Sequence, residues 1–413
     1  MSLSLRSVGV LALGLVLLTG CGSSGSGAGA GSAPASPSPS APATSSASAE
    51  PSGSTAVTTT QPATPTPSAS PSPSPGSKWT PEQLAGQRIV YSYPGTVPPA
   101  ALLDRIRAGR VAGVIFFAEN VGADPSVLRG AVDQLRQAQR ESPVAQPLLL
   151  MTDQEGGKVR RLPGAPVESA RQVGLSADPV AAATRTGGAA AANLTGYGLN
   201  TNLAPVLDVF RTPGDFADSL QRSYSNDPAT VGRLGSAFIR AQQGAGVAAT
   251  AKHFPGLGTA PAGANTDEEP VTLPVALDRL RAVDERPYQD AVAAGVRLVM
   301  LSWAIYPALH PGVPAGMSSV AIQDELRGRL HFTGVTITDA IEAQALAPVG
   351  STADRALAAA SAGSDLLLCS ARDVAQGDQA AAALATALSA GRLNRDAFTA
   401  SVDRITALRG TLK

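Results

Sequence analysis

The stretch that decides the fold is residues 247–256, VAATAKHFPG, where an apolar run ends abruptly in charged and polar residues. The run does not alternate between apolar and polar side chains, which is typical of a strand buried on both faces, as in a parallel sheet. Similar runs recur along the chain, separated by Ala-, Leu- and Arg-rich stretches of helical character. We predict eight strands, at 88–91, 111–117, 147–152, 201–207, 247–251, 296–301, 334–338 and 365–369.

Eight strand–helix units predict an α/β fold of the closed (β/α)8, TIM-type barrel class. An open, doubly wound sheet is the alternative. No Gly-x-Gly-x-x-Gly follows the first predicted strand, so no dinucleotide-binding motif supports that alternative.

The N-terminus has the pattern of a bacterial export signal. An apolar run at 8–18 follows Arg6 and is too short to span a bilayer. It ends in Leu18-Thr19-Gly20-Cys21, which resembles a lipobox. We therefore predict a signal peptide at 1–20, lipidation of Cys21, and a location on the extracellular face of the cell membrane. An ordinary secretory signal with a chance cysteine is the alternative.

The remainder divides into a linker and one domain. Residues 21–78 are rich in Ser, Pro, Ala, Gly and Thr, with Glu50 and Lys78 as the only charges, so we expect a disordered linker. Residues 79–413 are long enough for a single barrel, whose first helix we expect Thr80 to cap ahead of Pro81.

Composition excludes several classes of partner. The net charge is +0 and aromatic residues make up 4% of the chain, so no basic surface for nucleic acid is expected. No second apolar span is present, which leaves the lipid at Cys21 as the only predicted membrane contact. Cys369 is the one other cysteine, so we expect no internal disulfide and a core position for this thiol.

Polar residues gather where the predicted strands end. They include Glu119 after the second strand, Asp153 after the third, Asp208 after the fourth, Lys252 and His253 after the fifth, Ser302 and Trp303 after the sixth, and Asp339 after the seventh. Barrel enzymes build their sites on this face from the loops that follow the strands. The pattern therefore predicts an enzyme site there.

Three motifs carry a family resemblance. They are Asp153-Gln154-Glu155-Gly156-Gly157 with Arg161, then residues 252–258, KHFPGLG, and finally residues 334–340, GVTITDA. In this order they resemble family 3 glycoside hydrolases, in particular the β-N-acetylhexosaminidases that recycle bacterial cell walls. The resemblance covers residues 79–413 and implies a carbohydrate substrate, a (β/α)8 barrel and no cofactor. The sequence also lacks a metal-ligand spacing.

The resemblance also implies roles for individual residues. Asp339 matches the family nucleophile, which forms a covalent glycosyl-enzyme and gives net retention. A strand-end aspartate that caps the next helix is the alternative. Five residues match the family's sugar-binding positions: Asp153, Arg161, Arg222, Lys252 and His253. The alternative for Arg161 and Arg222 is a structural salt bridge, and the alternative for Lys252 and His253 is a buried polar network. We expect Asp208 to orient Arg222, and Trp303 to be either a sugar platform or part of the core.

The chain departs from the family at the acid/base. Related enzymes carry an Asp-Ser-His element after the Lys-His-Phe-Pro-Gly motif, whereas residues 257–270, LGTAPAGANTDEEP, contain no histidine. One hypothesis is that Asp267, Glu268 or Glu269 protonates the leaving group with a pKa raised by burial. The other is that the proton donor is lost and the protein is a catalytically weak or inactive glycan-binding lipoprotein. The three acidic residues could also be an ordinary solvated stretch.

Overall fold

Parallel strand pairing closes the sheet of this protein into a barrel, in the order β1-β10-β9-β8-β7-β6-β3-β2. A computed structural model describes residues 78–412. The barrel strands are β1 (Ile89–Tyr91), β2 (Gly113–Ile115), β3 (Leu149–Thr152), β6 (Thr201–Asn202), β7 (Ala248–Phe254), β8 (Leu298–Leu301), β9 (Val335–Ala340) and β10 (Leu366–Leu368). The predicted barrel class is confirmed, and each predicted strand overlaps one of these elements.

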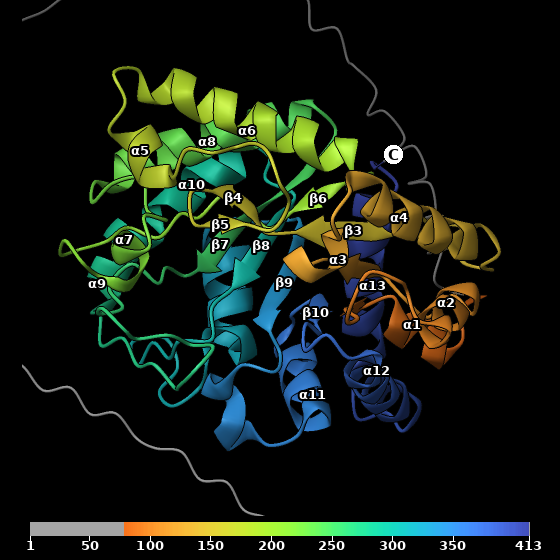
Figure 1. Cartoon of the computed structure of the whole chain (residues 1–413). Coiled ribbons are helices and arrows are strands. Elements are labelled where there is room, and N and C mark those ends of the chain that lie inside the picture. Colours follow the sequence, from red (N-terminus) through yellow and green to blue (C-terminus); the bar gives the residue numbers. More distant parts are fainter. Residues whose placement is uncertain (1–77, 413) are drawn as a thin grey trace, which may run out of the picture. The chain divides into compact units, whose positions relative to one another are not determined.

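Helices follow the strands and cover the outside of the barrel (Figure 1). The larger ones are α2 (Ala100–Arg107), α4 (Pro125–Arg140), α6 (Pro179–Gly196), α8 (Pro228–Gly244), α10 (Arg286–Ala293), η4 (Val320–Arg329), α11 (Thr352–Ala362), α12 (Val374–Ser389) and α13 (Arg395–Arg409). Short helices are α1 (Pro81–Gly86), α3 (Ala118–Val121), α5 (Ala170–Gly174), α7 (Phe216–Ser219), α9 (Leu277–Arg279), η2 (Leu280–Asp284), η3 (Ala315–Met317) and η5 (Gln344–Val349).

Three long helices begin with the same dipeptide. Asp124, Asp178 and Asp227 each precede a proline, and each carboxylate accepts a hydrogen bond from a backbone N–H in the first turn of α4, α6 or α8. A short acceptor at the N-cap satisfies an otherwise orphan donor, and proline at the next position is already preset for a helix. Thr80 caps α1 in the same way, as predicted, by accepting from the N–H of Gln83.

The strands are buried on both faces because they separate two hydrophobic layers. In β10, Leu366 and Leu368 pack inside the barrel, whereas Leu367 packs outward against the helices. Successive side chains of a strand point to opposite faces, so a run without polar interruptions serves both layers. Cys369 and Trp303 belong to the outer layer, which confirms the core position predicted for the thiol and places the indole in packing, with 1% of Trp303 exposed.

Three boundaries differ from the prediction. Strand β7 continues through Lys252 and His253 to Phe254, because Phe254 still pairs with Leu301 of β8. Strand β6 ends at Asn202 and resumes pairing only as a bridge between Val206 and Lys252. The stretch after β3 begins a further element that the sequence did not predict, a two-stranded antiparallel sheet of β4 (Gln154–Gly156) and β5 (Val159–Arg160).

The predicted signal peptide, the lipidation site at Cys21 and nearly all of the predicted linker lie outside the described residues. Within residues 78–412, none of the helices combines the length and apolarity needed to cross a bilayer.

Candidate active site

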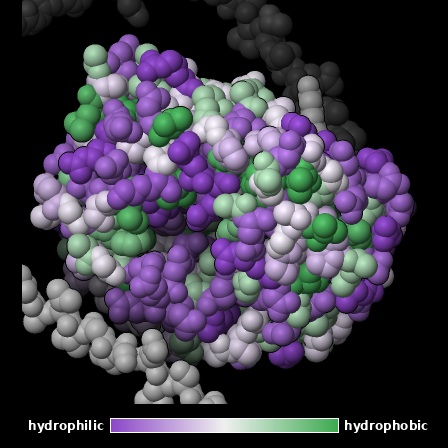
Figure 2. Space-filling model, viewed as in Figure 1, coloured by the Kyte–Doolittle hydropathy of each residue, from purple (hydrophilic) through white to green (hydrophobic). Residues whose placement is uncertain are grey.

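A pocket of about 180 Å³ opens at the carboxyl ends of the barrel strands. Its lining contains seven residues predicted from the sequence, which are Asp153, Arg161, Arg222, Lys252, His253, Asp267 and Asp339. Figure 2 shows a hollow near the centre of this face of the molecule, rimmed mainly by hydrophilic residues. Tertiary structure thus gathers side chains that are up to 186 positions apart, between Asp153 and Asp339, in one concave site.

The hairpin β4–β5 sets one wall of the pocket. Asp153 ends β3 and enters the hairpin, and its carbonyl accepts a hydrogen bond at 3.2 Å from the backbone N–H of Arg161. This bond brings the two predicted sugar-binding side chains together. The Nε atom of Arg161 is buried and has no hydrogen-bond partner within residues 78–412, so it is a donor available to a ligand.

A buried ionic network lies beside this wall and centres on Glu155. Lys252 Nζ donates to Asp153 Oδ1 and to Glu155 Oε1, both at 2.7 Å, and only 2% of Lys252 is exposed. Arg222 donates two parallel hydrogen bonds to Glu155, at 2.9 Å from Nε and 2.8 Å from Nη2. Such bidentate pairs fix both position and orientation.

The charges of this network support one another. Burial would raise the pKa of Glu155, but the neighbouring Arg222 and Lys252 lower that pKa far below its usual range. Burial likewise opposes the charged form of Lys252, yet Asp153 and Glu155 raise its pKa above the ordinary value. Glu155 and Lys252 are therefore both charged at neutral pH. Our sequence interpretation gave Glu155 no role; its place inside the Asp-Gln-Glu-Gly-Gly motif was the available signal.

Asp208 positions His253, and the expectation that it orients Arg222 was wrong. Its carboxylate lies 2.8 Å from His253 Nδ1 and accepts from the backbone N–H groups of His253, at 3.2 Å, and Leu257, at 2.8 Å. The reason is local: β6 and β7 are neighbours, so the end of one strand meets the backbone of the next. With Nδ1 held by a carboxylate, the Nε2 atom of His253 is directed to the pocket side, 3.5 Å from Arg222 Nη2.

Asp339 stands near the end of β9 and lines the pocket without an ion pair among residues 78–412. Its Oδ1 accepts one hydrogen bond at 2.9 Å, from the backbone N–H of Ala340. The alternative of a helix-capping aspartate is disfavoured, because η5 begins after Ala343 and no side chain caps it. The carboxylate is therefore held at the pocket with lone pairs free to react.

The loop after β7 brings a second carboxylate to the pocket. The carbonyls of Thr266 and Asp267 accept hydrogen bonds from the backbone N–H groups of Ala345, at 3.2 Å, and Gln344, at 3.0 Å. The loop is thereby tied to the segment that follows Asp339. Asp267 keeps part of its surface exposed but lines the pocket, where partial burial and the neighbouring Asp339 carboxylate raise its pKa to about 6.

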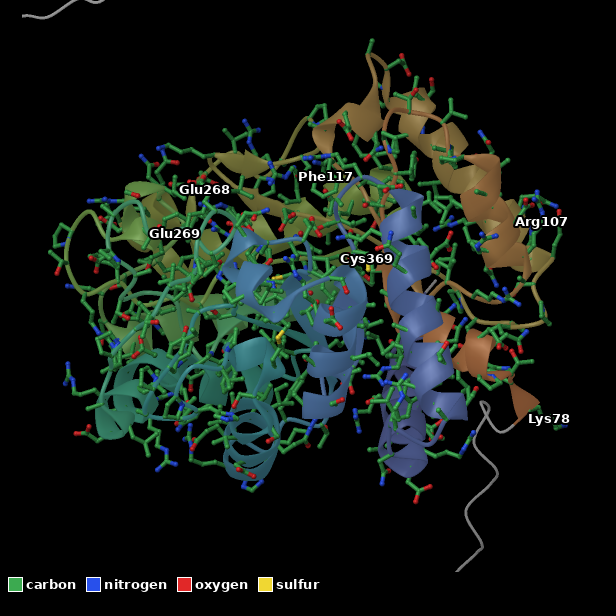
Figure 3. All side chains as sticks on the ribbon, turned by 90° about the horizontal axis from the view of Figure 1, so that it is seen from below. Lys78, Arg107, Phe117, Glu268, Glu269 and Cys369 are labelled. Atoms are coloured by element: carbon green, nitrogen blue, oxygen red, sulfur yellow. The ribbon has the colours of Figure 1, made fainter. Side chains whose placement is uncertain are left out.

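Glu268 and Glu269 are exposed and do not line the pocket. A turn explains the difference. The Asn265 side chain accepts from the N–H of Asp267 at 3.0 Å and donates to Glu268 Oε1 at 3.0 Å. This turn separates Asp267 from the two residues that follow it, and both glutamates lie well to one side of Phe117 in Figure 3. Of the three candidate acids, geometry brings only Asp267 to Asp339.

The chemistry available is that of two carboxylates beside a set of hydrogen-bond donors. Among residues 78–412 no group of His, Cys, Asp and Glu side chains is arranged to hold a metal ion. The donors on Arg161, Arg222, Lys252 and His253 suit hydroxyl and carbonyl oxygens. A carboxylate without an ion pair, next to a carboxyl group whose pKa is raised, can divide the tasks of nucleophile and acid with it.

Comparisons with known proteins agree with this site. Residues 95–408 match the N-terminal domain of glycosyl hydrolase family 3. The chain is 45% identical to a protein named as an uncharacterized secreted glycosyl hydrolase of Arthroderma benhamiae, over 79% of this chain and 93% of that protein. It is 34% identical to a beta-hexosaminidase of Xanthomonas oryzae, over 75% of this chain and 93% of the relative.

A solved structure extends the likeness to three dimensions. A glycoside hydrolase family 3 beta-N-acetylglucosaminidase from Paenibacillus sp. superposes with a TM-score of 0.75 at 33% sequence identity, covering 80% of this chain. This chain spans 62% of that longer protein. With the family match over most of the barrel and the relatives above 30% identity, the chain belongs to glycosyl hydrolase family 3.

Proposed function

We propose that this glycoside hydrolase is a retaining, exo-acting β-N-acetylhexosaminidase that cleaves amino-sugar glycosides derived from cell walls. The observation that carries the proposal is the pair of dissimilar carboxylates in one pocket. Asp339 has no ion pair among the described residues, and the pKa of Asp267 is raised to about 6. A carboxyl group whose pKa is raised can donate a proton to the leaving group, while a second carboxylate in the same pocket acts as the nucleophile of a glycosidase.

The proposed reaction has two steps. Asp339 attacks the anomeric carbon while the bond to the leaving oxygen breaks, and Asp267 gives its proton to that oxygen. Water then attacks the anomeric carbon, Asp267 takes back a proton, and the bond to Asp339 breaks with net retention. Throughout, Asp153, Lys252 and His253 hold the sugar hydroxyls, while Arg161 and Arg222 supply further donors.

The same observations argue against the alternative, a glycan-binding protein without activity. That alternative rests on the absence of the family's histidine between residues 257 and 270. Asp267 reaches the pocket from the same loop and carries a proton at mildly acidic pH, which supports a substitute acid/base. The small size of the pocket, about 180 Å³, further supports the binding of one terminal sugar and hence exo action.

The proposal includes export and lipid anchoring at Cys21, with residues 21–78 as a spacer. Support comes from the lipobox-like sequence ahead of Cys21, and from the relative in Arthroderma benhamiae whose name describes a secreted protein. An anchored enzyme would act on wall fragments outside the membrane.

The test is hydrolysis of aryl β-N-acetylglucosaminide beside aryl β-glucoside, with Asp339→Ala as the control. We expect turnover of the amino sugar and a loss of at least about a thousandfold in Asp339→Ala, since removal of a nucleophile removes the covalent route. A fluorinated glycosyl fluoride should also add its sugar mass to the peptide containing Asp339. Turnover of neither aryl substrate by the wild-type protein would contradict the proposal.

A further inference from the structure

The pocket has a second wall that the proposed sugar-binding residues do not use. It is formed by side chains after β2 and β10, on the other side of Asp339 from Lys252 and His253 in the strand order. The half-buried Phe117 and the hydroxyl-bearing Ser370 line the pocket here. We call Phe117, Ser370 and Arg372 the β2–β10 wall.

An ion pair holds the aromatic ring of this wall in place. The guanidinium of Arg372 lies over the Phe117 ring, 4.4 Å from its centroid, and its Nε is 3.3 Å from Glu119 Oε1. The backbone N–H of Arg372 donates to Ser92 Oγ at 2.8 Å, although its φ of 59° is uncommon for a residue with a side chain. Arg372 thus covers one side of Phe117, whose ring also forms part of the pocket lining.

The wall is physically connected to the proposed proton donor. Gln344 donates to the carbonyl of Asp267, and two residues earlier Glu342 accepts from Ser370 Oγ at 2.6 Å and from Ser370 N at 3.2 Å. Gln376 fixes the same Glu342 carboxylate from α12, at 3.1 Å. The contacts run without a gap from the Asp267 loop through Glu342 to Ser370. Asp267, Phe117 and Ser370 line the same pocket, so a leaving group that receives the proton of Asp267 lies in the space that they share.

The charges of the two walls differ. Around the proposed sugar-binding residues, three carboxylates (Asp153, Glu155 and Asp208) accompany three cations (Arg161, Arg222 and Lys252). On the other side, Asp339, Glu119 and Glu342 lie near two cations when Asp267 carries its proton: Arg372, and Arg355, whose Nη1 donates to the carbonyls of Ile341 and Ala343 beside Glu342. The carboxylates there exceed the cations by one charge, and Glu119 already occupies the guanidinium of Arg372. A free carboxylate on the leaving group would be repelled.

We infer that the β2–β10 wall binds the leaving group, with Phe117 as its platform, and that its surplus of carboxylates selects a leaving sugar without a free carboxylate. The inference rests on the proposed function and narrows it to neutral amino-sugar oligomers among wall-derived glycosides. The platform contact is of the kind aromatic rings make with apolar faces.

The experiment compares three substrates with the same N-acetylglucosaminyl group. The leaving groups are N-acetylglucosamine, N-acetylmuramic acid with its free lactyl carboxylate, and fluoride, which is too small to reach the platform. For the wild-type protein in 10 mM salt, kcat/KM should favour the neutral disaccharide over the acidic one by about three- to tenfold. The preference should shrink in 0.5 M salt, where exposed charges are screened.

Two variants test the two parts of the inference. Glu119→Gln removes one carboxylate and frees Arg372, so the preference for the neutral disaccharide should fall by about threefold. Phe117→Ala should lower the ratio of kcat/KM for the neutral disaccharide to kcat/KM for the fluoride by about three- to tenfold. Glu141→Gln is the matched control, because Glu141 is 44% exposed and pairs with Arg107, much as Glu119 is 43% exposed and pairs with Arg372.

The inference is overturned if the wild-type protein prefers the acidic disaccharide or neither. It is also overturned if Glu119→Gln moves the preference no more than Glu141→Gln, or if Phe117→Ala leaves the disaccharide-to-fluoride ratio in place. Failure of the wild-type protein to hydrolyse even the fluoride would instead contradict the proposed function. In that case the inference is tested by calorimetry. The ratio of the affinities for the neutral and the acidic disaccharide should then change in Glu119→Gln, and not in Glu141→Gln, as expected for kcat/KM.

Discussion

Asp267 is the single residue on which the proposed chemistry most depends. Its pKa of about 6 arises from burial and from the Asp339 carboxylate. A general acid must be protonated, so kcat/KM should decline about tenfold for each pH unit above roughly pH 6. Asp267→Asn should lose about 10²- to 10⁴-fold in kcat with poor leaving groups and lose this descending limb of the profile. Initial rates across pH 4.5–8 measure both effects.

A chemical rescue separates this role from a structural one. Azide added to Asp267→Ala should restore turnover of an activated aryl glycoside and release a glycosyl azide of retained configuration, because this anionic nucleophile displaces Asp339 from the anomeric carbon without help from a general base. Glu268→Gln and Glu269→Gln serve as neighbouring controls. If either costs as much as Asp267→Asn, the assignment of the acid/base to Asp267 is wrong.

Glu155 is expected to matter mainly for the stability of the fold. Glu155→Gln would leave Lys252 and Arg222 short of a buried partner, and breaking such a network costs about 3–5 kcal/mol in the free energy of unfolding. Since the folded-state pKa of Glu155 is lowered, its contribution is fully present above the unfolded value of about 4.3 and is lost as the pH falls below it.

Urea denaturation at pH 7 and pH 3.5 tests this sign. The difference between wild-type and Glu155→Gln should be large at pH 7 and smaller at pH 3.5. Glu141→Gln, at an exposed ion pair, should change the free energy of unfolding little at either pH, because solvent screens such pairs. An equal effect of the two substitutions would show that Glu155 is not the centre of the network.

At the scale of elements, the loop after β7 must pack closely to carry Asp267. A Cβ added at Gly258 would lie 2.0 Å from the carbonyl oxygen of Val209, so Gly258→Ala must push the loop outward. We expect kcat/KM to fall by more than about tenfold, since small displacements of a catalytic group are costly. Gly130→Ala on α4 is the control, because nothing lies within 4 Å of its added Cβ. Steady-state rates with Gly258→Ala equal to wild-type would refute the prediction.

Elements also differ in how far the sequence predicts them. The eight barrel strands follow from uninterrupted apolar runs, which carry a strong signal because both faces are buried. The hairpin β4–β5 has one strand of three residues and one of two, with charged residues in both, so it lacks any such pattern. It exists because Asp153 and Gln154 are held by partners elsewhere, such as Asn202, which accepts from Gln154 N–H at 3.0 Å.

For the whole molecule, we expect the lipid anchor to determine where the protein is located without affecting its catalytic rate. In the native host, Cys21→Ser should move the protein from the membrane fraction to the medium, because the thiol is the predicted site of lipidation. The kcat/KM for an aryl substrate should stay within about twofold, since the barrel has its own core. Detergent phase partitioning and rates on both forms measure the outcome. Retention of Cys21→Ser in the membrane fraction would contradict the lipid anchor.

The sequence by itself determined the barrel class and six of the pocket's residues. This was possible because strands that are buried on both faces have uninterrupted apolar sequences, and because the sites of such barrels lie where the strands end. The Asp153, Lys252 and Asp339 positions were therefore predictable from their places in the chain. The family resemblance added their proposed roles.

Only the tertiary structure decided between residues that are neighbours in sequence. Asp267, Glu268 and Glu269 are chemically alike, and only the turn at Asn265 and the bonds to Gln344 and Ala345 bring the first of them to the pocket. Likewise, because neighbouring strands carry them, Asp208 pairs with His253, whereas Arg222 pairs with Glu155. Such choices depend on contacts between distant segments, and the pKa of a carboxyl group depends on the charges and burial that those contacts create.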